Sequence, residues 1–339
     1  MTEGIAGVDH AVLEQWLSRH ASVTVPVRAR LLTGARSNLT YLLEAADGQR
    51  YALRRPPTGA VLASAHDMAR EWRFISALAD TPVPVARPVA WCDDREVSDA
   101  DLYVMSFVEG VVLDSESSAG AMAGPVRRRA SEDLVRVLAE LHAVDAEALG
   151  LGDRQRAEGY VARQLKRWSA QIELLDPPER ATLLEGAALL GDRIPPQRTG
   201  VVHGDFRPGN LALGPDGAVR AVFDWELATV GDVHADLGWL VATWAEPGKD
   251  LPRLIVGPTG DGGFLTRAEL VAAYEKAAGA TVPDLDFYVA FAHWRLCCIT
   301  VGVRHRYQEG AMADDGFDGE SLTEGIGWWS QRVVEMMAR

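Results

Sequence analysis

The chain has 339 residues, 47% of them hydrophobic and 24% charged, and its formal net charge is −14. This length exceeds the usual size of one hydrophobic core, and the composition is typical of a folded globular protein rather than a disordered one. The negative charge argues against a nucleic-acid partner, because phosphate backbones are bound by clustered Lys and Arg. The first residues lack the pattern of a signal peptide, no apolar run reaches membrane-spanning length, and the three cysteines match neither a disulfide framework nor a zinc site. We therefore expect a cytoplasmic protein with no membrane partner.

The first part of the sequence is predicted to be mainly β structure. Residues 9–20 have the apolar spacing of a helix, with Asp9 as its N-cap. Three strand-like runs follow within residues 25–55, where the pair Asp47-Gly48 indicates a hairpin turn. The other elements expected here are a helix in 64–80, a Pro-rich arm leading into a strand in 81–94, and a buried strand in 101–110.

Beyond residue 125 the pattern becomes helical, apart from short β-like pieces in 200–225. The turn sequence GPDG at 214–217 predicts a small hairpin between two of these pieces. Helical spacing is seen in 131–145, 160–175, 178–194, 267–279, 286–307 and 321–337. Because the composition changes near residue 110, we predict an α+β fold with two domains. They are a β-rich domain with a leading helix at 1–108 and a helical domain at 109–339.

One short stretch, VVHGDFRPGN at 201–210, concentrates polar side chains on a segment that can be neither helix nor continued strand. Asn210 ends this loop, and Asp224 follows the second strand of the predicted hairpin. A neutral oxygen and an anionic oxygen brought together in this way suit a hard cation such as Mg²⁺. Asp205 would then lie beside the cation and accept a proton from a substrate hydroxyl. This arrangement is typical of phosphoryl transfer, where catalysis depends on positioning and charge neutralisation.

The roles of the other polar residues near this loop are less specifically predicted by the sequence. The His203 ring is expected to hydrogen-bond the loop backbone, although it lies among the candidate catalytic residues. Arg207 fits equally well as a contact to a phosphate or an acidic substrate group, or as the partner of a neighbouring carboxylate. Asp236 is expected to accept backbone hydrogen bonds from the loop or to cap a helix. Glu226 could add charge near the metal, or be an ordinary exposed carboxylate.

The sequence HGDFRPGN, followed by FDWE, resembles the catalytic loop and metal-binding segment of the aminoglycoside phosphotransferase-like kinases. The resemblance implies a protein-kinase-like fold with a small antiparallel β-rich lobe and a larger, mainly helical lobe. It also implies an ATP- and Mg²⁺-dependent kinase that phosphorylates a hydroxyl of a small molecule. The segments SNLTY, LRRPP and DWELATVGD are most similar to the phosphotransferase domain fused to acyl-CoA dehydrogenase-like proteins. That subgroup suggests a hydroxyacyl-CoA acceptor in preference to an aminoglycoside.

The same resemblance assigns a site for ATP or another nucleoside triphosphate. Arg54 stands where relatives have the lysine that pairs with the phosphates, and Glu71 matches the helix glutamate that pairs with that cation. The other implied nucleotide contacts are Ser37 and Asn38 in the phosphate loop and Ser106 and Val108 in the hinge.

Several alternatives stay open at this point. Arg54 and a phosphate loop with a single glycine, Gly34, also fit a nucleotide-binding pseudokinase with a sensing or scaffolding role. A metal-dependent phosphohydrolase is a weaker alternative. The pair formed by Arg54 and Glu71 could be a surface salt bridge of little energetic weight. The basic cluster of Arg295, Arg304, His305 and Arg306 is expected to be a solvated helix face, with the binding of CoA phosphates or a carboxylate as its alternative. The tryptophans at 294, 328 and 329 are expected in the core rather than at a ligand platform.

Overall fold

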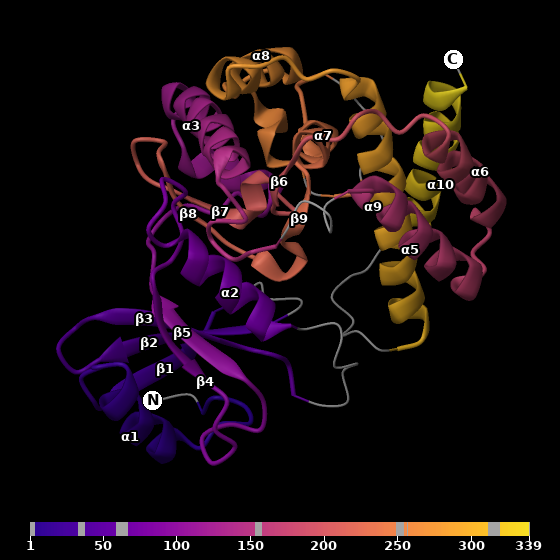
Figure 1. Ribbon diagram of the computed structural model, residues 1–339. Coiled ribbons are helices and arrows are strands. Elements are labelled where there is room, and N and C mark those ends of the chain that lie inside the picture. Colours follow the sequence, from indigo (N-terminus) through magenta and orange to yellow (C-terminus); the bar gives the residue numbers. More distant parts are fainter. Residues whose placement is uncertain are drawn as a thin grey trace. The chain divides into compact units, whose positions relative to one another are not determined.

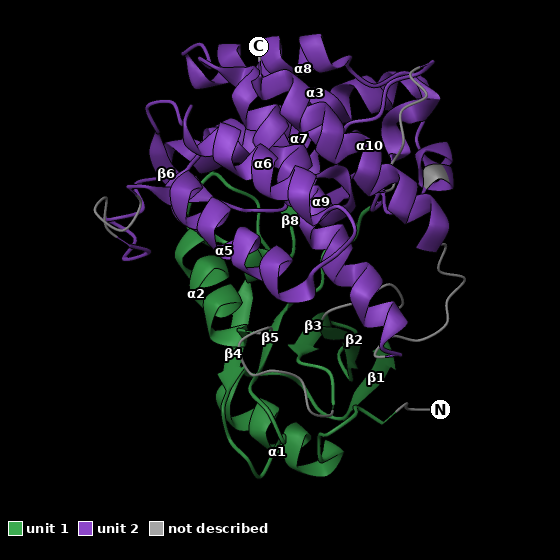
Figure 2. Ribbon diagram, turned by 90° about the vertical axis from the view of Figure 1, so that its right-hand side faces the viewer, with its two compact units in different colours: residues 1–110, 220–228 green, residues 111–219, 229–339 purple. Residues whose placement is uncertain are grey.

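The computed structural model describes residues 4–32, 38–58, 67–152, 158–248, 254–255, 257–310 and 319–338. The chain divides into two compact units, the first comprising 1–110 with 220–228 and the second 111–219 with 229–339 (Figure 2). The sequence analysis placed 220–228 in the second domain. These residues pack with the first unit because the Trp225 ring stacks on Phe74 at 6.4 Å and Val222 N donates to Pro84 O at 2.8 Å.

The first unit is built on a five-stranded antiparallel sheet with the strand order β1-β2-β3-β5-β4 (Figure 1). Its strands are β1 Val27–Leu31, β2 Leu39–Ala45, β3 Arg50–Arg55, β4 Pro88–Cys92 and β5 Leu102–Ser106. The predicted turn at Gly48 joins β2 to β3, with Gly48 N donating to Ala45 O at 2.9 Å. The predicted β-rich character of this part of the chain is therefore confirmed.

Two helices pack against the sheet. Successive side chains along a strand point to opposite faces of the sheet, so the two helices contact different side chains of the strands. Helix α1 (His10–His20) begins after Asp9, whose carboxylate accepts from the N–H of Ala11 at 3.0 Å and of Val12 at 3.1 Å, as the N-cap prediction requires. Its Leu13 and Leu17 share one core with side chains of all five strands. Helix α2 (Met68–Leu78) contacts β4 and β5 instead, where its Trp72 ring lies 5.9 Å from Tyr103.

The register of the sheet places two residues of the candidate site on one face. Arg54 of β3 is directly opposite Tyr103 of β5, so the two side chains point to the same side. This is the side on which α2 packs, and α2 carries Glu71.

The second unit is mainly helical and confirms the predicted helical segments beyond residue 125. Its helices are α3 Gly124–Ala143, α5 Tyr160–Leu175, α6 Arg180–Gly191, α7 His234–Thr243, α8 Arg267–Ala278, α9 Leu285–Gln308 and α10 Gly319–Met337. Helices α5, α6, α9 and α10 enclose one core that contains Trp294 and Trp329, as expected. Trp328 differs from the expectation, since 39% of its surface is exposed. Among the described residues, none of the helices combines the length and the hydrophobicity that a membrane span requires.

Short elements fill the region between α6 and α7 and position the central loop. Strand β6 (Thr199–Val202) pairs antiparallel with β9 (Thr229–Asp232). The loop leaves β6 and passes through a single 3₁₀ turn, η2 (Pro208–Asn210), into β7 (Leu211–Leu213). The predicted turn at 214–217 is present, with Gly214 N donating to Ala218 O at 2.8 Å, and β8 (Val219–Val222) follows it. The other 3₁₀ turns are η1 Glu116–Ala121, η3 Trp225–Leu227 and η4 Pro258–Asp261.

Candidate active site

The loop that follows β6 is held by a buried carboxylate. Asp236, in the first turn of α7, accepts hydrogen bonds from His203 N at 2.6 Å and from Gly204 N at 2.8 Å. Gly204 has a φ of +88°, a conformation that favours glycine. These contacts match the bracing role predicted for Asp236.

The surroundings of Asp236 favour its ionised form. Burial alone would raise its pKa, but the hydrogen bond and charge of His142, with the charge of His203 and the N–H of Gly204, lower it below the usual value. His142 Nε2 lies 3.5 Å from the carboxylate, and its Nδ1 is 2.7 Å from the hydroxyl of Tyr274. The loop backbone is thus anchored on a buried anion that is itself supported by side chains of α3 and α8.

His203 is fully buried and serves the loop itself. Its Nδ1 accepts a hydrogen bond from Asp205 N at 3.2 Å, which is the kind of backbone contact that the sequence analysis expected. The ring also lies edge-on to Phe206 at 5.9 Å. Its burial gives a substrate no access to the ring, so the structure offers no support for a catalytic role.

Asp205, by contrast, is held firmly but is partly exposed, with 20% of its side-chain surface accessible. Asn210 Nδ2 donates both to Asp205 Oδ2 and to Asp205 O, each at 2.8 Å. Because the amide nitrogen is used in this way, the amide oxygen is the atom that Asn210 can offer to a cation. Arg207 Nε lies 3.2 Å from Asp205 Oδ1 and 3.3 Å from Oδ2, so Arg207 pairs with a neighbouring carboxylate, and its contact with a phosphate or an acidic substrate group stays a prediction.

Two residues that the sequence analysis did not assign to the site support Asp205. Trp239 of α7 donates from Nε1 to Asp205 Oδ1 at 2.7 Å. The Arg295 guanidinium lies 4.4 Å from the centre of the Trp239 ring and donates to Gly204 O.

The expectation of a solvated basic face is therefore wrong for two of its members. Arg295 is only 4% exposed. Arg304 is also buried, and both of its terminal nitrogens pair with Glu179, at 2.9 and 2.8 Å.

A second group of predicted residues meets inside the first unit. Arg54 Nε lies 2.9 Å from Glu71 Oε2, and its Nη2 is 3.2 Å from Glu71 Oε1 and 2.7 Å from Asp224 Oδ1. Glu71 is 1% exposed, so the alternative of a surface salt bridge between Arg54 and Glu71 is wrong. The additional pairing with Asp224 was not foreseen.

Glu71 has two further donors besides Arg54. Tyr103 OH donates to Glu71 Oε2 at 2.6 Å, and Asn38 Nδ2 donates to Oε1 at 2.9 Å. Burial raises the pKa of Glu71, and the charge of Arg54 offsets part of that rise. Asn38 is buried in this role, so it supports Glu71, and its direct contact with a nucleotide stays a prediction.

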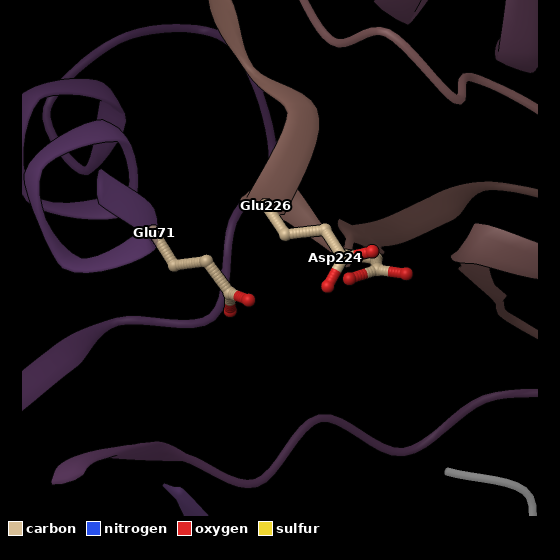
Figure 3. Close-up of side chains that lie close together, drawn as sticks. All are labelled: Glu71, Asp224 and Glu226. Carbon is tan, nitrogen blue, oxygen red and sulfur yellow. The ribbon is translucent and has the colours of Figure 1, made fainter. Parts of the chain in front are cut away.

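Three carboxylates, those of Glu71, Asp224 and Glu226, lie close together (Figure 3). One oxygen from each of Glu71, Asp224 and Glu226 lies within 4.8 Å of the others. Burial alone would lower the pKa of Arg54, but the negative charges of Glu71, Asp224 and Glu226, with Tyr103, raise it. Arg54 is therefore the cation that this cluster holds in the structure.

The other residues predicted to bind the nucleotide are Ser37, Ser106 and Val108, and the hydrogen bonds described above do not test that prediction. Ser37 lies outside the described residues. Ser106 ends β5, and its Oγ accepts from Arg87 N at 2.9 Å, while Val108 is half-buried just beyond the strand. The structure thus assembles Asp205 with Asn210 in the second unit, and Arg54 with Glu71 and Asp224 in the first.

Comparisons with known proteins identify the family of the chain. The sequence profile described as "Phosphotransferase enzyme family" matches residues 28–288. Acyl-CoA dehydrogenase family member 11 of Gallus gallus is 32% identical over 289 residues, which cover 82% of this chain and 36% of that protein. The chain thus spans little more than a third of that relative's length.

Solved structures show the same likeness. A candidate aminoglycoside phosphotransferase from Ralstonia eutropha JMP134 has a TM-score of 0.81 and 31% identity, over 98% of each chain. The streptomycin-ATP-APH(2")-IIa ternary complex has a TM-score of 0.57 and 16% identity, over 98% of this chain and 99% of that one. These likenesses confirm the predicted kinase-like α+β fold. With its profile match, its relatives and its fold in agreement, the chain belongs to the phosphotransferase enzyme family.

Proposed function

We propose that this protein is an ATP- and Mg²⁺-dependent kinase that transfers the γ-phosphoryl group to a hydroxyl of a small molecule. The observation that carries the proposal is the state of Asp205. Its carboxylate is fixed by several donors, stands on a loop anchored by Asp236, and still keeps a fifth of its surface accessible. A general base needs this combination of fixed position and access to the substrate.

In the proposed reaction, Asp205 orients the substrate hydroxyl and accepts its proton. The hydroxyl oxygen forms a bond to the γ-phosphorus while the bond from that phosphorus to the leaving oxygen of ADP breaks. Arg54 pairs with the phosphates of the nucleotide through a planar fork that suits two oxygens. Glu71, held by Tyr103 and Asn38, fixes the direction of that fork.

The residues assigned to the metal fit a hard cation. Asn210 uses its amide nitrogen on Asp205, which directs the amide oxygen to another partner. Asp224 contacts Arg54 through Oδ1, and a quarter of its side-chain surface is accessible. Bound Mg²⁺ would neutralise phosphate charge, with Asn210 and Asp224 as its protein ligands.

For the acceptor, we favour hydroxyacyl-CoA thioesters. Support comes from the name of one relative, acyl-CoA dehydrogenase family member 11, which is 32% identical to this chain over 289 residues. Aminoglycosides are the alternative, and the structure from Ralstonia eutropha that carries that name supports testing them.

The test begins with thermal-shift measurements of ATP and GTP, each with and without Mg²⁺. ATP labelled at the γ-phosphate is then offered with two panels, hydroxyacyl-CoA thioesters of varied chain length and aminoglycosides, and products are identified by mass spectrometry. We expect Mg²⁺-dependent stabilisation by ATP and label transfer to the thioester panel. Transfer to aminoglycosides alone would refute the acceptor assignment. Nucleotide binding without any labelled product, from these panels or a wider set of alcohols, would favour the pseudokinase.

A further inference from the structure

Trp239 and Asp236 lie on the same face of α7, since residues three apart on a helix are neighbours. Both reach the loop that carries Asp205, but they bind different parts of it. Asp236 accepts from backbone N–H groups, whereas Trp239 donates its indole N–H to the Asp205 carboxylate at 2.7 Å. One helix therefore fixes both the backbone of the loop and its key side chain.

The hydrogen bond from the Trp239 indole restricts rotation of the Asp205 carboxylate about its last side-chain torsion. The last torsion of an aspartate side chain is broad, so a single donor leaves the plane of the carboxylate poorly defined. Trp239 donates to Oδ1 and Asn210 donates to Oδ2 at 2.8 Å, and these two short bonds to different oxygens define the plane. Arg207 Nε adds a longer contact, 3.2 Å from Oδ1 and 3.3 Å from Oδ2. Oδ2 already accepts from Asn210 and Arg207, whereas Oδ1 accepts from Trp239 and can still accept a hydrogen bond from a substrate.

Trp239 is itself held in place. It is 3% exposed, and the guanidinium of Arg295 from α9 lies 4.4 Å from its ring centre. Arg295 also donates to the carbonyl of Gly204, the residue before Asp205. The indole thus has a fixed position relative to the loop, and its N–H has a fixed direction.

We propose that Trp239 is a positioning residue for phosphoryl transfer, which orients the Asp205 carboxylate toward the substrate hydroxyl through its indole N–H. The proposal rests on the proposed role of Asp205 as the base. A misplacement of a reacting group by ~1 Å can lower a rate by about 100-fold. Loss of the indole N–H should therefore lower kcat, with little effect on nucleotide affinity.

The variant is Trp239→Phe, which keeps an aromatic face for Arg295 and removes the N–H. The chain offers a matched control in Trp244→Phe. Trp244 is also buried and also donates its indole N–H, at 2.8 Å, but to Leu265 O rather than to Asp205. Both variants lose one buried indole hydrogen bond and the same number of atoms, so their thermal stabilities measure the structural cost of the change.

The contact is tested first without any activity measurement. In protein with ¹⁵N-labelled tryptophan, the ten indole N–H resonances are recorded, and those of Trp239 and Trp244 are assigned from the two Phe variants. We expect Asp205→Ala to move the Trp239 resonance and leave the Trp244 resonance in place. A Trp239 resonance that does not move would overturn the proposal.

Kinetics then test the consequence. We expect Trp239→Phe to lower kcat by about 10- to 100-fold with the KM for ATP changed by no more than about twofold, and Trp244→Phe to keep kcat within about twofold. Equal kcat values for the two variants at similar stability would overturn the proposal. If the unchanged protein transfers no phosphoryl group, the proposed function fails, and the resonance measurement still decides whether Trp239 orients Asp205.

Discussion

Arg54 and Asp224 form an ion pair inside the first unit, with Nη2 of the arginine 2.7 Å from Oδ1 of the aspartate. The same guanidinium pairs with Glu71, so one cation serves two carboxylates that come from different segments of the chain. A nucleotide phosphate that binds Arg54 must therefore compete with Glu71 and Asp224 for the guanidinium. A cation that binds Asp224 must likewise compete with Arg54 for the carboxylate.

Arg54→Met is expected to destabilise the protein by about 3–5 kcal/mol, because it leaves the buried Glu71 carboxylate without its cation. Arg50→Met, in the same strand, removes a pair with Glu109 at 2.5 Å that is largely exposed and should cost ~1 kcal/mol or less. Denaturant unfolding of both variants measures the difference. Adding Glu71→Gln to Arg54→Met should restore part of the loss, and equal stability of the two single variants would contradict the account.

Gly238→Ala is expected to destabilise the protein by about 1–3 kcal/mol through overpacking. A Cβ on Gly238 would lie 2.5 Å from the backbone oxygen of Tyr288, where α7 packs against α9, and backbone atoms cannot easily move aside. Because α7 carries Asp236 and Trp239, kcat should fall as well.

Gly327→Ala in α10 is the matched control, since no described atom lies within 4 Å of its Cβ position. Helix propensity predicts that this change stabilises the protein by roughly 0.5–1 kcal/mol. Melting temperatures of the two variants should therefore move in opposite directions, and movement in the same direction would count against the packing described for α7.

His293 should make the folded protein sensitive to acid. Burial, with a smaller effect from the charge of Arg267, lowers its pKa from 6.5 to about 3. The folded state therefore keeps this ring neutral while the unfolded chain takes up a proton as the pH falls below 6.5, so the unfolded state binds more protons and stability decreases. By pH 5 the loss from this residue is roughly 2 kcal/mol.

His293→Phe should reduce that loss, since Phe can keep the stacking on Trp329, where the ring centres are 3.5 Å apart. His20→Phe is the control, because His20 also stacks on a tryptophan, Trp16 at 4.9 Å, but is exposed. The measurement is the unfolding free energy between pH 7 and pH 5. If His293→Phe loses as much stability over this range as the unchanged protein, the assignment of the acid sensitivity to His293 is wrong.

The regular elements could be predicted because their signals are local. Asp9 caps α1 through its own side chain, and the Asp47-Gly48 turn joins β2 to β3 as its sequence indicates. Strand β9 was not predicted, since it has only four residues, including Gly231 and Asp232, and depends on pairing with the distant β6. A helix was considered at Asp236 only as the alternative to its bracing role, and the extent of α7 was not predicted, because this helix is buried along its whole length and shows no exposed polar face.

The same distinction applies to the candidate site. Asp205 and Asn210 were found because they lie five residues apart in one loop, and their side chains do meet. Trp239, Arg295 and Tyr103 were missed, because a tryptophan, an arginine or a tyrosine on a regular element reads as ordinary packing until tertiary contacts are known. The one available signal for Trp239 was its position three residues after Asp236 on the same helix.

The central claim is that Asp205 is the base of a phosphoryl transfer. The most direct test measures Mg²⁺-dependent ATP binding and single-turnover phosphoryl transfer for Asp205→Asn, with Asp216→Asn as the control, since Asp216 is an exposed residue of the 214–217 turn. We expect Asp205→Asn to bind ATP within about twofold of the unchanged protein and to transfer phosphoryl ~100- to 10,000-fold more slowly, while the control keeps both properties. Transfer by Asp205→Asn at the rate of the unchanged protein would contradict the account.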